Sequence, residues 1–270
     1  MLGTALCAVF PDAMAWDLTE IDITKAEETA AKIAAWQSEH IGDEYVIINA
    51  AAYTDVDGAE EQQQQAFLIN EVGVRNVALA ANAIGATVVH YSTDYVFSGD
   101  APEGYNELAP PGPAVNVYGE SKLAGEHELS KAQVRHYIIR TAWLYGPKGK
   151  NFVDTMLKLA DKRLELRVIN DQQGSPTYTK DVAHGTLELV TNDYEPGVYH
   201  LVNGGVATWY EFAQKIFVLA DKNVVVTPTT TMEYPLPARR PTWSKLLNTK
   251  GPVLRPWEEA LADYLGTKVA

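Results

Sequence analysis

The sequence is poor in cysteine and in basic residues. Cys7 is the only cysteine among 270 residues, which excludes a disulfide framework and a thiolate metal cluster and favours a cytoplasmic location. Lys and Arg together number 22 against 35 Asp and Glu, so the formal net charge is −13. Nucleic-acid-binding proteins usually present a basic face. We therefore expect no nucleic-acid partner.

Long hydrophobic runs are also absent. No apolar stretch approaches the ~20 residues of a membrane-spanning helix. The segment from Met1 to Ala8 is apolar but lacks the basic leader of a secretory signal. We therefore expect no membrane partner. The hydrophobic content of 46 % can fill a core, and 270 residues suit one large α/β domain or a domain with an added lobe.

Apolar runs bounded by turn residues alternate with helix-like patterns. The runs that predict buried strands are 13–16, 45–50, 86–92 and 135–143. The segments that predict helices between them are 25–40, 66–85 and 117–132. This alternation predicts an α/β fold, a doubly wound, Rossmann-like parallel sheet with helices on both faces. We expect a dinucleotide-binding domain at 1–150. Residues 151–270 should form mostly a smaller substrate-binding lobe, with some segments returning to the main sheet.

One expected element is missing from the start of the sequence. A dinucleotide-binding sheet normally begins with a strand and a Gly-rich turn, whose backbone N–H groups approach the pyrophosphate at a helix N-terminus. This sequence opens with MLGTALCAVF, which is typical of the helix after that turn. We assign Leu2 and Gly3 to the cofactor, with Gly3 as the last glycine of such a loop. The sheet should therefore lack its first strand.

The stretch NVYGESKLAGE (116–126) places Tyr118 and Lys122 four positions apart. Residues at this spacing share one face of a helix. A free phenol, with a pKa of about 10, is a poor proton donor at neutral pH. A neighbouring ammonium lowers that pKa and can also hold a ribose hydroxyl. The same spacing is common in ordinary surface helices, so both interpretations stay open at this point.

Polar residues follow two of the predicted strands. Ser92, Thr93 and Asp94 lie at and just beyond the end of one, and ligands in open α/β sheets bind outside the carboxyl ends of strands. Thr93 can hydrogen-bond both the phenol and a substrate carbonyl oxygen, or the three residues can form a helix cap. The preceding strand ends in NAAAYT (49–54). Its small residues either let a ring or ribose lie against the backbone or pack a tight corner.

Other candidate residues also have two interpretations each. Asp17 can accept hydrogen bonds from the adenosine ribose and repel a 2′-phosphate, which favours NADH over NADPH, or it can cap the following turn. Trp143 follows a strand, where its ring can stack on a ligand or pack in the core. Arg239 and Arg240, in LPARRPT, suit a pyrophosphate, or they form a solvated surface pair.

Several blocks of the sequence together resemble one enzyme family. The blocks are NAAAYTDVDGAE, STDYVFSG, VYGESKLAGE, RTAWLYG, NFVDTML, VINDQQGSPTYT and PARRPTWSKL. They are similar to the successive motifs of the dTDP-4-dehydrorhamnose reductases, which are extended-type short-chain dehydrogenases. The resemblance runs from residue 2 to the carboxyl end. The N-terminal strand and the Gly-rich loop of the family are the part that has no counterpart in this sequence.

The resemblance implies an NADPH- or NADH-dependent reduction of the C4 keto group of dTDP-4-dehydro-L-rhamnose to dTDP-L-rhamnose. It implies that Tyr118 is the general acid, that Lys122 is its electrostatic partner and a ribose ligand, and that Thr93 is the third catalytic residue. The implied cofactor contacts are Asp17, Asp22 and Ile23 on the adenosine side and Ala52, Tyr53 and Thr54 at the sheet end. The implied substrate contacts are Thr93, Asp94 and Trp143, to which the sequence itself adds Arg239 and Arg240.

Two further hypotheses remain. The chain could be a non-catalytic binding protein on the same scaffold, like the regulatory β subunit of methionine adenosyltransferase, or a fragment without stable activity. Fold alone does not decide between them. The sequence contains no metal-ligand cluster, although a carboxylate-bound Mg²⁺ at a subunit contact would leave little trace in it. A homodimer is compatible with the sequence.

Overall fold

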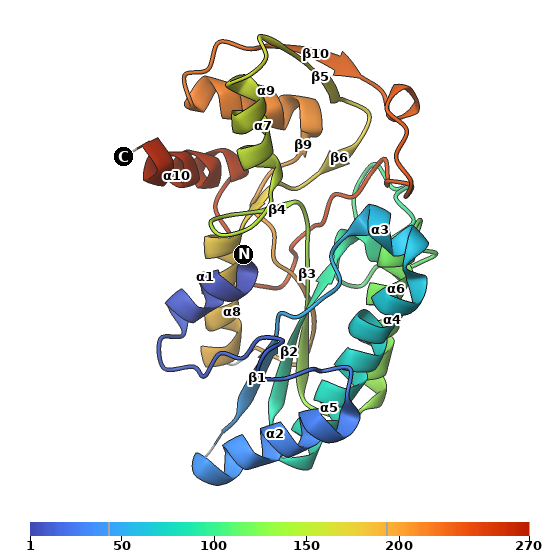
Figure 1. Cartoon of the computed structure of the whole chain (residues 1–270), viewed down its shortest axis with the longest axis vertical. Helices are drawn as coiled ribbons and strands as arrows, with labels where there is room; N and C mark the ends of the chain where they lie inside the picture. The colour runs from blue at the N-terminus through green and yellow to red at the C-terminus, as the bar shows by residue number, and fades with distance from the viewer. Residues whose placement is uncertain (43, 193, 270) are drawn as a thin grey trace.

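The structure, a computed structural model, describes residues 1–42, 44–192 and 194–269. Its centre is a four-stranded parallel sheet in the order β1-β2-β3-β8 (Figure 1). The strands are β1 (Val46–Asn49), β2 (Thr87–Thr93), β3 (His136–Thr141) and β8 (Gly197–His200). The predicted α/β fold is confirmed, and the predicted strands at 45–50, 86–92 and 135–143 correspond to β1, β2 and β3.

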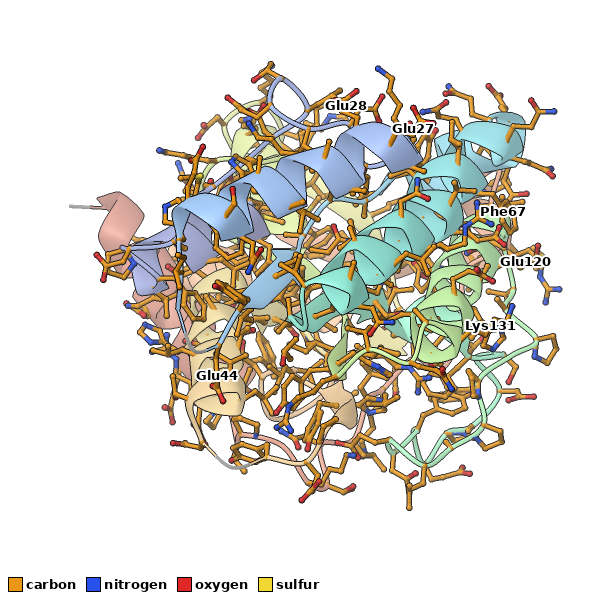
Figure 2. The ribbon with its side chains drawn as sticks, turned by 90° about the horizontal axis from the view of Figure 1, so that it is seen from below. Glu27, Glu28, Glu44, Phe67, Glu120 and Lys131 are labelled. Carbon is orange, nitrogen blue, oxygen red and sulfur yellow. The ribbon has the colours of Figure 1, made fainter. Side chains whose placement is uncertain are left out.

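Helices cover both faces of this sheet. One face carries α2 (Ala26–Glu39), α5 (Val74–Ala83) and α6 (Val117–Lys131), which lie in a row in Figure 2. The other face carries α1 (Leu2–Val9) and α8 (Thr179–Thr191), which pack together in Figure 1. Successive side chains of a strand point to opposite faces. Val88 accordingly packs with Leu129 in one core, and Val89 packs with Leu6 in the other.

The prediction of a strand at 13–16 is wrong. These residues have no regular secondary structure, and the chain runs from α1 to α2 through turns. β1 is an edge strand, and Val46 is 38 % exposed. A strand forms only where a neighbour satisfies its backbone groups, and no segment of the described chain pairs with the outer side of β1. Trp16 instead packs edge-on against Trp36 of α2, at 6.3 Å between ring centroids.

The connection between β1 and α5 contains three short helices. They are α3 (Val56–Glu61), α4 (Gln63–Phe67) and the π-helix η1 (Leu68–Gly73). The helix predicted at 66–85 therefore corresponds to the end of α4, then η1, then α5. π-Helical turns are rare and occur frequently at functional sites. This turn lies beside α6, the helix that carries Tyr118 and Lys122.

A second, smaller unit lies beyond the carboxyl ends of the main strands (Figure 1). It pairs two parallel strands and packs three helices around them, namely β5 (Glu165–Ile169), β10 (Val225–Thr229), α7 (Phe152–Ala160), α9 (Trp209–Leu219) and α10 (Trp257–Val269). Its core is aromatic and includes Tyr145, Phe212 and Tyr264. The segment from α8 to β8 lies with the main sheet. A substrate-binding role for the smaller unit stays a prediction.

Short elements connect the two units. Two small ladders pair β4 (Leu144–Tyr145) with β7 (Thr177–Tyr178) and β6 (Gln173–Gly174) with β9 (Ala207–Thr208). Two 3₁₀ turns follow β2 and β10, namely η2 (Asp94–Val96) and η3 (Thr231–Glu233). Within the described ranges, every helix is too short or too polar to cross a membrane.

Candidate active site

The N-terminus of α6 is fixed by side chains from two distant segments. Asn116 caps the helix, because its Oδ1 accepts a hydrogen bond from the Gly119 N–H at 2.8 Å. Its Nδ2 donates to the carbonyl oxygen of Arg239 at 2.8 Å. Glu60 of α3 accepts from the Val117 N–H at 3.0 Å. These bonds satisfy donors that a helix N-terminus leaves free, so the first turn of α6 has a defined position.

Tyr118 lies beside the end of β2. Gly119 makes this possible, because a Cβ at that position would overlap the carbonyl oxygen of Tyr95. The Tyr95 and Tyr118 rings meet edge to face, with 5.8 Å between their centroids. The Thr93 hydroxyl hydrogen-bonds the Tyr118 phenol. The structure therefore brings together the two residues that the sequence analysis assigned to proton transfer.

The pKa of Tyr118 is shifted upward in this structure. Burial raises it to about 12, the hydrogen bond with Thr93 lowers it, and the Asp94 carboxylate raises it. The net shift is upward because the desolvation of the phenolate outweighs the hydrogen bond with Thr93. A lowering of this pKa by the Lys122 ammonium stays a prediction. In this state Tyr118 is a protonated phenol at neutral pH.

Lys122 lies deep in the interface between α6 and the sheet. Only 2 % of the residue is exposed. Its Nζ is 3.4 Å from Nε2 of His90 on β2. Burial lowers the pKa of Lys122 to about 8, and the carboxylate of Glu126, one turn further along the helix, raises it. The amine is therefore still mostly charged at neutral pH.

Thr93 and Asp94 combine the two interpretations made from the sequence. The Thr93 hydroxyl donates to Asp94 Oδ1 at 3.0 Å and accepts from the Tyr95 N–H at 3.2 Å, so it caps η2. Asp94 is buried, and burial raises the pKa of its carboxyl group to about 6. The cap and the candidate site therefore share the same residues.

Asn70 of η1 joins the loop after β1 to α6. Its Oδ1 accepts from the Tyr53 N–H at 2.9 Å, and its Nδ2 donates to the Tyr53 carbonyl at 3.1 Å and to Ser121 Oγ at 2.9 Å. Tyr53 packs in one apolar cluster with Tyr118. The sequence analysis missed Asn70, although a fully buried amide inside a predicted apolar helix is a signal that could have identified it. Ala52 is half-buried and Thr54 is exposed.

Asp17 and Asp22 act as turn caps. Asp17 Oδ1 accepts from the backbone N–H and the hydroxyl of Thr19, both at 2.8 Å. Asp22 Oδ1 accepts in the same way from Thr24, at 3.1 and 2.7 Å. The cap interpretation of Asp17 is thus present in the structure. Its role in selecting NADH over NADPH stays a prediction.

The remaining candidate cofactor residues lie on separate elements. Ile23 packs against Gly73, at the end of η1, where a Cβ would overlap the isoleucine side chain. Leu2 and Gly3 form the first turn of α1, which has no side-chain cap. A Cβ at Gly3 would meet no atom within 4 Å. The structure leaves open space at this turn, but it does not bring Leu2 or Gly3 into contact with Tyr118 or Lys122.

Trp143 packs against another tryptophan. It follows β3 with a φ of 46°, an uncommon conformation for a residue other than glycine. Its ring stacks on Trp209 of α9, with 3.4 Å between centroids and 4° between planes. Trp209 donates from Nε1 to Gln172 at 3.1 Å. One face of the Trp143 ring is therefore covered by protein, and Trp209 and Gln172 are neighbours that the sequence analysis could not assign.

Arg239 and Arg240 have different surroundings. Arg240 makes a two-pronged ion pair with Asp57 of α3, at 3.0 and 2.8 Å, and its side chain is 13 % exposed. The pair links the segment before Pro241 to the main domain. The Arg239 side chain is exposed and makes no ion pair with any residue of the described ranges. Of the two arginines, Arg239 is thus the one available to an anionic ligand.

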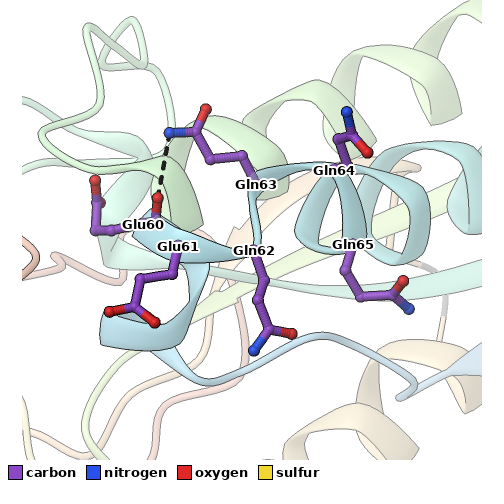
Figure 3. A pocket seen from close by; sticks show the side chains of 6 residues that line it. All are labelled: Glu60, Glu61, Gln62, Gln63, Gln64 and Gln65. Atoms are coloured by element: carbon purple, nitrogen blue, oxygen red, sulfur yellow. Dashed lines mark hydrogen bonds between the residues drawn. The ribbon is translucent and has the colours of Figure 1, made fainter.

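A shallow polar depression lies at the junction of α3 and α4, next to the N-terminus of α6. It is lined by Glu60, Glu61 and the four glutamines 62–65, and Gln63 Nε2 donates to the Glu60 carbonyl at 3.3 Å (Figure 3). The lining contains carboxylates and amides but no cation. It does not suit an anionic nucleotide sugar or a dinucleotide.

The described residues offer side-chain donors to the nicotinamide end of a dinucleotide cofactor but not to its pyrophosphate. Tyr118 lies beside the carboxyl end of β2, and Lys122 lies one turn further along α6, next to His90; the two donors suit a nicotinamide and a ribose. At the other end, the N–H groups of the first turn of α1 and the open space at Gly3 are the features that could face a pyrophosphate. Among the described residues, no three His, Cys, Asp or Glu side chains gather as metal ligands would.

Comparison with known proteins supports the resemblance. The family model described as RmlD substrate binding domain matches residues 1–269. The chain belongs to this family. The dTDP-4-dehydrorhamnose reductase of Escherichia coli K12 is 45 % identical over 217 residues, which are 76 % of this chain and 72 % of that protein. The spore coat polysaccharide biosynthesis protein SpsK of Bacillus subtilis is 43 % identical over 82 % of this chain and 78 % of that protein.

Solved structures agree with this assignment. A dTDP-4-dehydrorhamnose reductase from Clostridium acetobutylicum superposes with a TM-score of 0.92 at 38 % identity, covering 100 % of this chain and 96 % of that one. The Bacillus anthracis reductase, solved in complex with NADP, gives 0.88 at 39 % identity over 95 % of this chain and 90 % of that one. The family resemblance found in the sequence is confirmed.

Proposed function

We propose that this chain is an NAD(P)H-dependent reductase that converts the C4 keto group of dTDP-4-dehydro-L-rhamnose into the alcohol of dTDP-L-rhamnose. The observation that carries the proposal is the hydrogen bond between Thr93 and Tyr118 at the carboxyl end of β2, with Lys122 one turn further along α6. Relatives that are 40–45 % identical carry the name of this activity. A structural neighbour at 39 % identity was solved with NADP.

The chemistry divides between the cofactor and the chain. When bound, the cofactor supplies a hydride to the C4 carbon. Tyr118 donates its phenolic proton to the C4 oxygen, so the new C–H and O–H bonds balance the lost carbonyl π bond, and the phenolate then recovers a proton from water. Thr93 hydrogen-bonds the carbonyl oxygen beside the phenol. Lys122 holds a ribose hydroxyl and stabilises the phenolate after proton transfer.

The substrate side of the site follows from the smaller unit. Arg239 is proposed to bind the pyrophosphate of the nucleotide sugar. Its exposure beside the N-terminus of α6 and the lack of an ion pair among the described residues support this role. Asp94 and Trp143 lie next to Thr93 and β3 and are proposed to contact the sugar nucleotide. The stacking of Trp143 on Trp209 covers one face of its ring, so both faces are not available for this contact.

The direct test is a turnover assay of the purified chain with dTDP-4-dehydro-L-rhamnose. We expect loss of NADPH or NADH absorbance, dependent on the nucleotide sugar, with dTDP-L-rhamnose as the product detected by chromatography. Comparing kcat/KM for NADH and NADPH tests the prediction that Asp17 favours NADH. A chain that binds NADPH but reduces no nucleotide sugar would support the binding-protein hypothesis instead.

Replacing Arg239 by glutamine should raise KM for the nucleotide sugar by about 10- to 100-fold, because a hydrogen bond to a charged group contributes about 1.5–3 kcal/mol. KM for NADPH should hardly change. Arg240→Gln is the matched control. It removes the ion pair with Asp57, so it should lower the melting temperature more than it changes KM for the nucleotide sugar. Equal changes of KM for both ligands in Arg239→Gln would place Arg239 outside the substrate site.

A further inference from the structure

One buried imidazole lies between Asn49 of β1 and Lys122 of α6. His90 on β2 is fully buried. Its Nε2 faces Lys122 Nζ of α6 at 3.4 Å, and its Nδ1 faces the side-chain Nδ2 of Asn49 on β1 at 3.3 Å. The sequence analysis gave no role to either His90 or Asn49. Together with Lys122 they form a line of side chains from the edge strand to the site.

This line has more donors than acceptors. Burial, together with the electrostatic influence of Lys122 and His136, keeps the pKa of His90 well below its usual range, so the ring is neutral. A neutral imidazole has one N–H and one lone pair. Lys122 is an ammonium donor, and Asn49 presents its NH₂ group, because its Oδ1 accepts from the Ala51 N–H at 3.2 Å. Only one of the two donors can use the lone pair.

We propose that His90 is a positioning residue for Lys122, whose ammonium donates to Nε2 of the ring. A charge-assisted hydrogen bond is about twice as strong as a neutral one, so the ammonium takes the lone pair in preference to the Asn49 amide. His90 then carries its proton on Nδ1. The bond fixes the lysine amine on the sheet side of α6, where its reach toward a ribose hydroxyl and the phenol of Tyr118 is defined. This role in catalysis rests on the proposed reductase function.

The tautomer of His90 can be measured without any substrate. In ¹⁵N-labelled protein near neutral pH, we expect the ring nitrogen shifts of His90 to show a protonated Nδ1 and an unprotonated Nε2, with His90→Gln identifying the signals. In Lys122→Met the Asn49 amide becomes the sole donor, so the proton should move to Nε2. A wild-type ring protonated at Nε2, or the same tautomer in both proteins, would overturn the proposal.

Kinetics test the positioning role. His90→Leu removes the acceptor and should lower kcat and raise KM for NADPH, each by about tenfold, while KM for the nucleotide sugar changes little. His90→Gln places an amide oxygen near the position of Nε2, so kcat and KM for NADPH should both return close to their wild-type values. Cofactor affinity measured by fluorescence titration gives the same comparison without turnover. A Gln variant as impaired as the Leu variant in both assays would contradict the role.

The pH profile gives a third measurement. The groups that act on the amine and the ring are Glu126, His136 and the amide of Asn49, besides the contact of the two with each other. The charged form of Lys122 is lost as pH rises through about 8, so kcat/KM should fall above that pH. Removing the Nε2 acceptor disfavours the ammonium further. The alkaline fall should therefore move to lower pH in His90→Leu and return in His90→Gln.

A neighbouring residue separates positioning from stability. Tyr91 lies next to His90 on β2 but points to the opposite face, where its hydroxyl bonds Thr186 at 2.7 Å. Tyr91→Phe should lower the melting temperature, but it should not raise KM for NADPH while leaving KM for the nucleotide sugar unchanged. If His90→Leu behaves like Tyr91→Phe, the role of His90 is only structural. The tautomer can switch in Lys122→Met even if neither the wild type nor any variant reduces the nucleotide sugar. In that case the hydrogen bond between Lys122 and His90 is supported and the proposed function is wrong.

Discussion

Tyr118→Phe is expected to lower kcat for reduction of the nucleotide sugar by roughly 10²–10⁴-fold, the usual contribution of general acid catalysis. Burial raises the pKa of Tyr118 to about 12, so the phenol stays protonated across the neutral range and gives up its proton only to a stronger base, the alkoxide that forms at C4. The ring and its edge-to-face contact with Tyr95 remain in the variant. KM for both ligands should therefore change little, as steady-state NADPH oxidation would reveal.

A second tyrosine provides the control for this experiment. Tyr137 on β3 donates its hydroxyl proton to the Tyr194 carbonyl at 2.8 Å, within the core on the α1 and α8 side of the sheet. Tyr137→Phe also removes one phenolic hydroxyl, but it should leave kcat unchanged. Near-normal turnover of Tyr118→Phe would remove Tyr118 from the mechanism, and equal losses in both variants would indicate a general effect on folding.

Arg140→Met is expected to destabilise the protein by about 3–5 kcal/mol and to lower its melting temperature by roughly 10 °C. Arg140 on β3 binds Glu126 of α6 through two hydrogen bonds of 2.9 and 2.7 Å, and the two side chains are 3 % and 5 % exposed. Removing the arginine leaves a carboxylate buried without its partner, which costs more than the pair itself contributes. Thermal unfolding followed by circular dichroism measures the change.

Two further variants test the physical reason. Arg140→Met combined with Glu126→Leu removes both charges, so the double variant should be more stable than Arg140→Met alone. Lys222→Ala breaks the exposed pair with Asp161, whose side chains are 39 % and 62 % exposed, and should cost about 1 kcal/mol or less. A small effect of Arg140→Met, comparable with that of Lys222→Ala, would mean that the buried pair does not require its partner.

The sequence by itself determined three of the four strands of the sheet and the helix that carries Tyr118 and Lys122. β2 and β3 are covered by helices on both faces, so nearly every residue in them is buried, and each contains adjacent apolar residues instead of a strict alternation with polar ones. The pair of Tyr118 and Lys122 is fixed by the period of one helix, and Thr93 is fixed by the end of one strand. These features depend on local periodicity and on the rule that ligands bind at the carboxyl edge of a parallel sheet.

Only the tertiary structure decided which partner each side chain has. The residues at 13–16 have the composition of a strand, but no neighbour pairs with them in the described chain. Arg240 lies 183 positions from Asp57, with which it forms an ion pair, and Lys122 lies 32 positions from His90. Local patterns report which face of an element is apolar, but they do not report what packs against it. Hydrogen bonds, ion pairs and the pKa values that follow from them depend on those distant partners, because each is set by distances of a few ångströms in the folded chain.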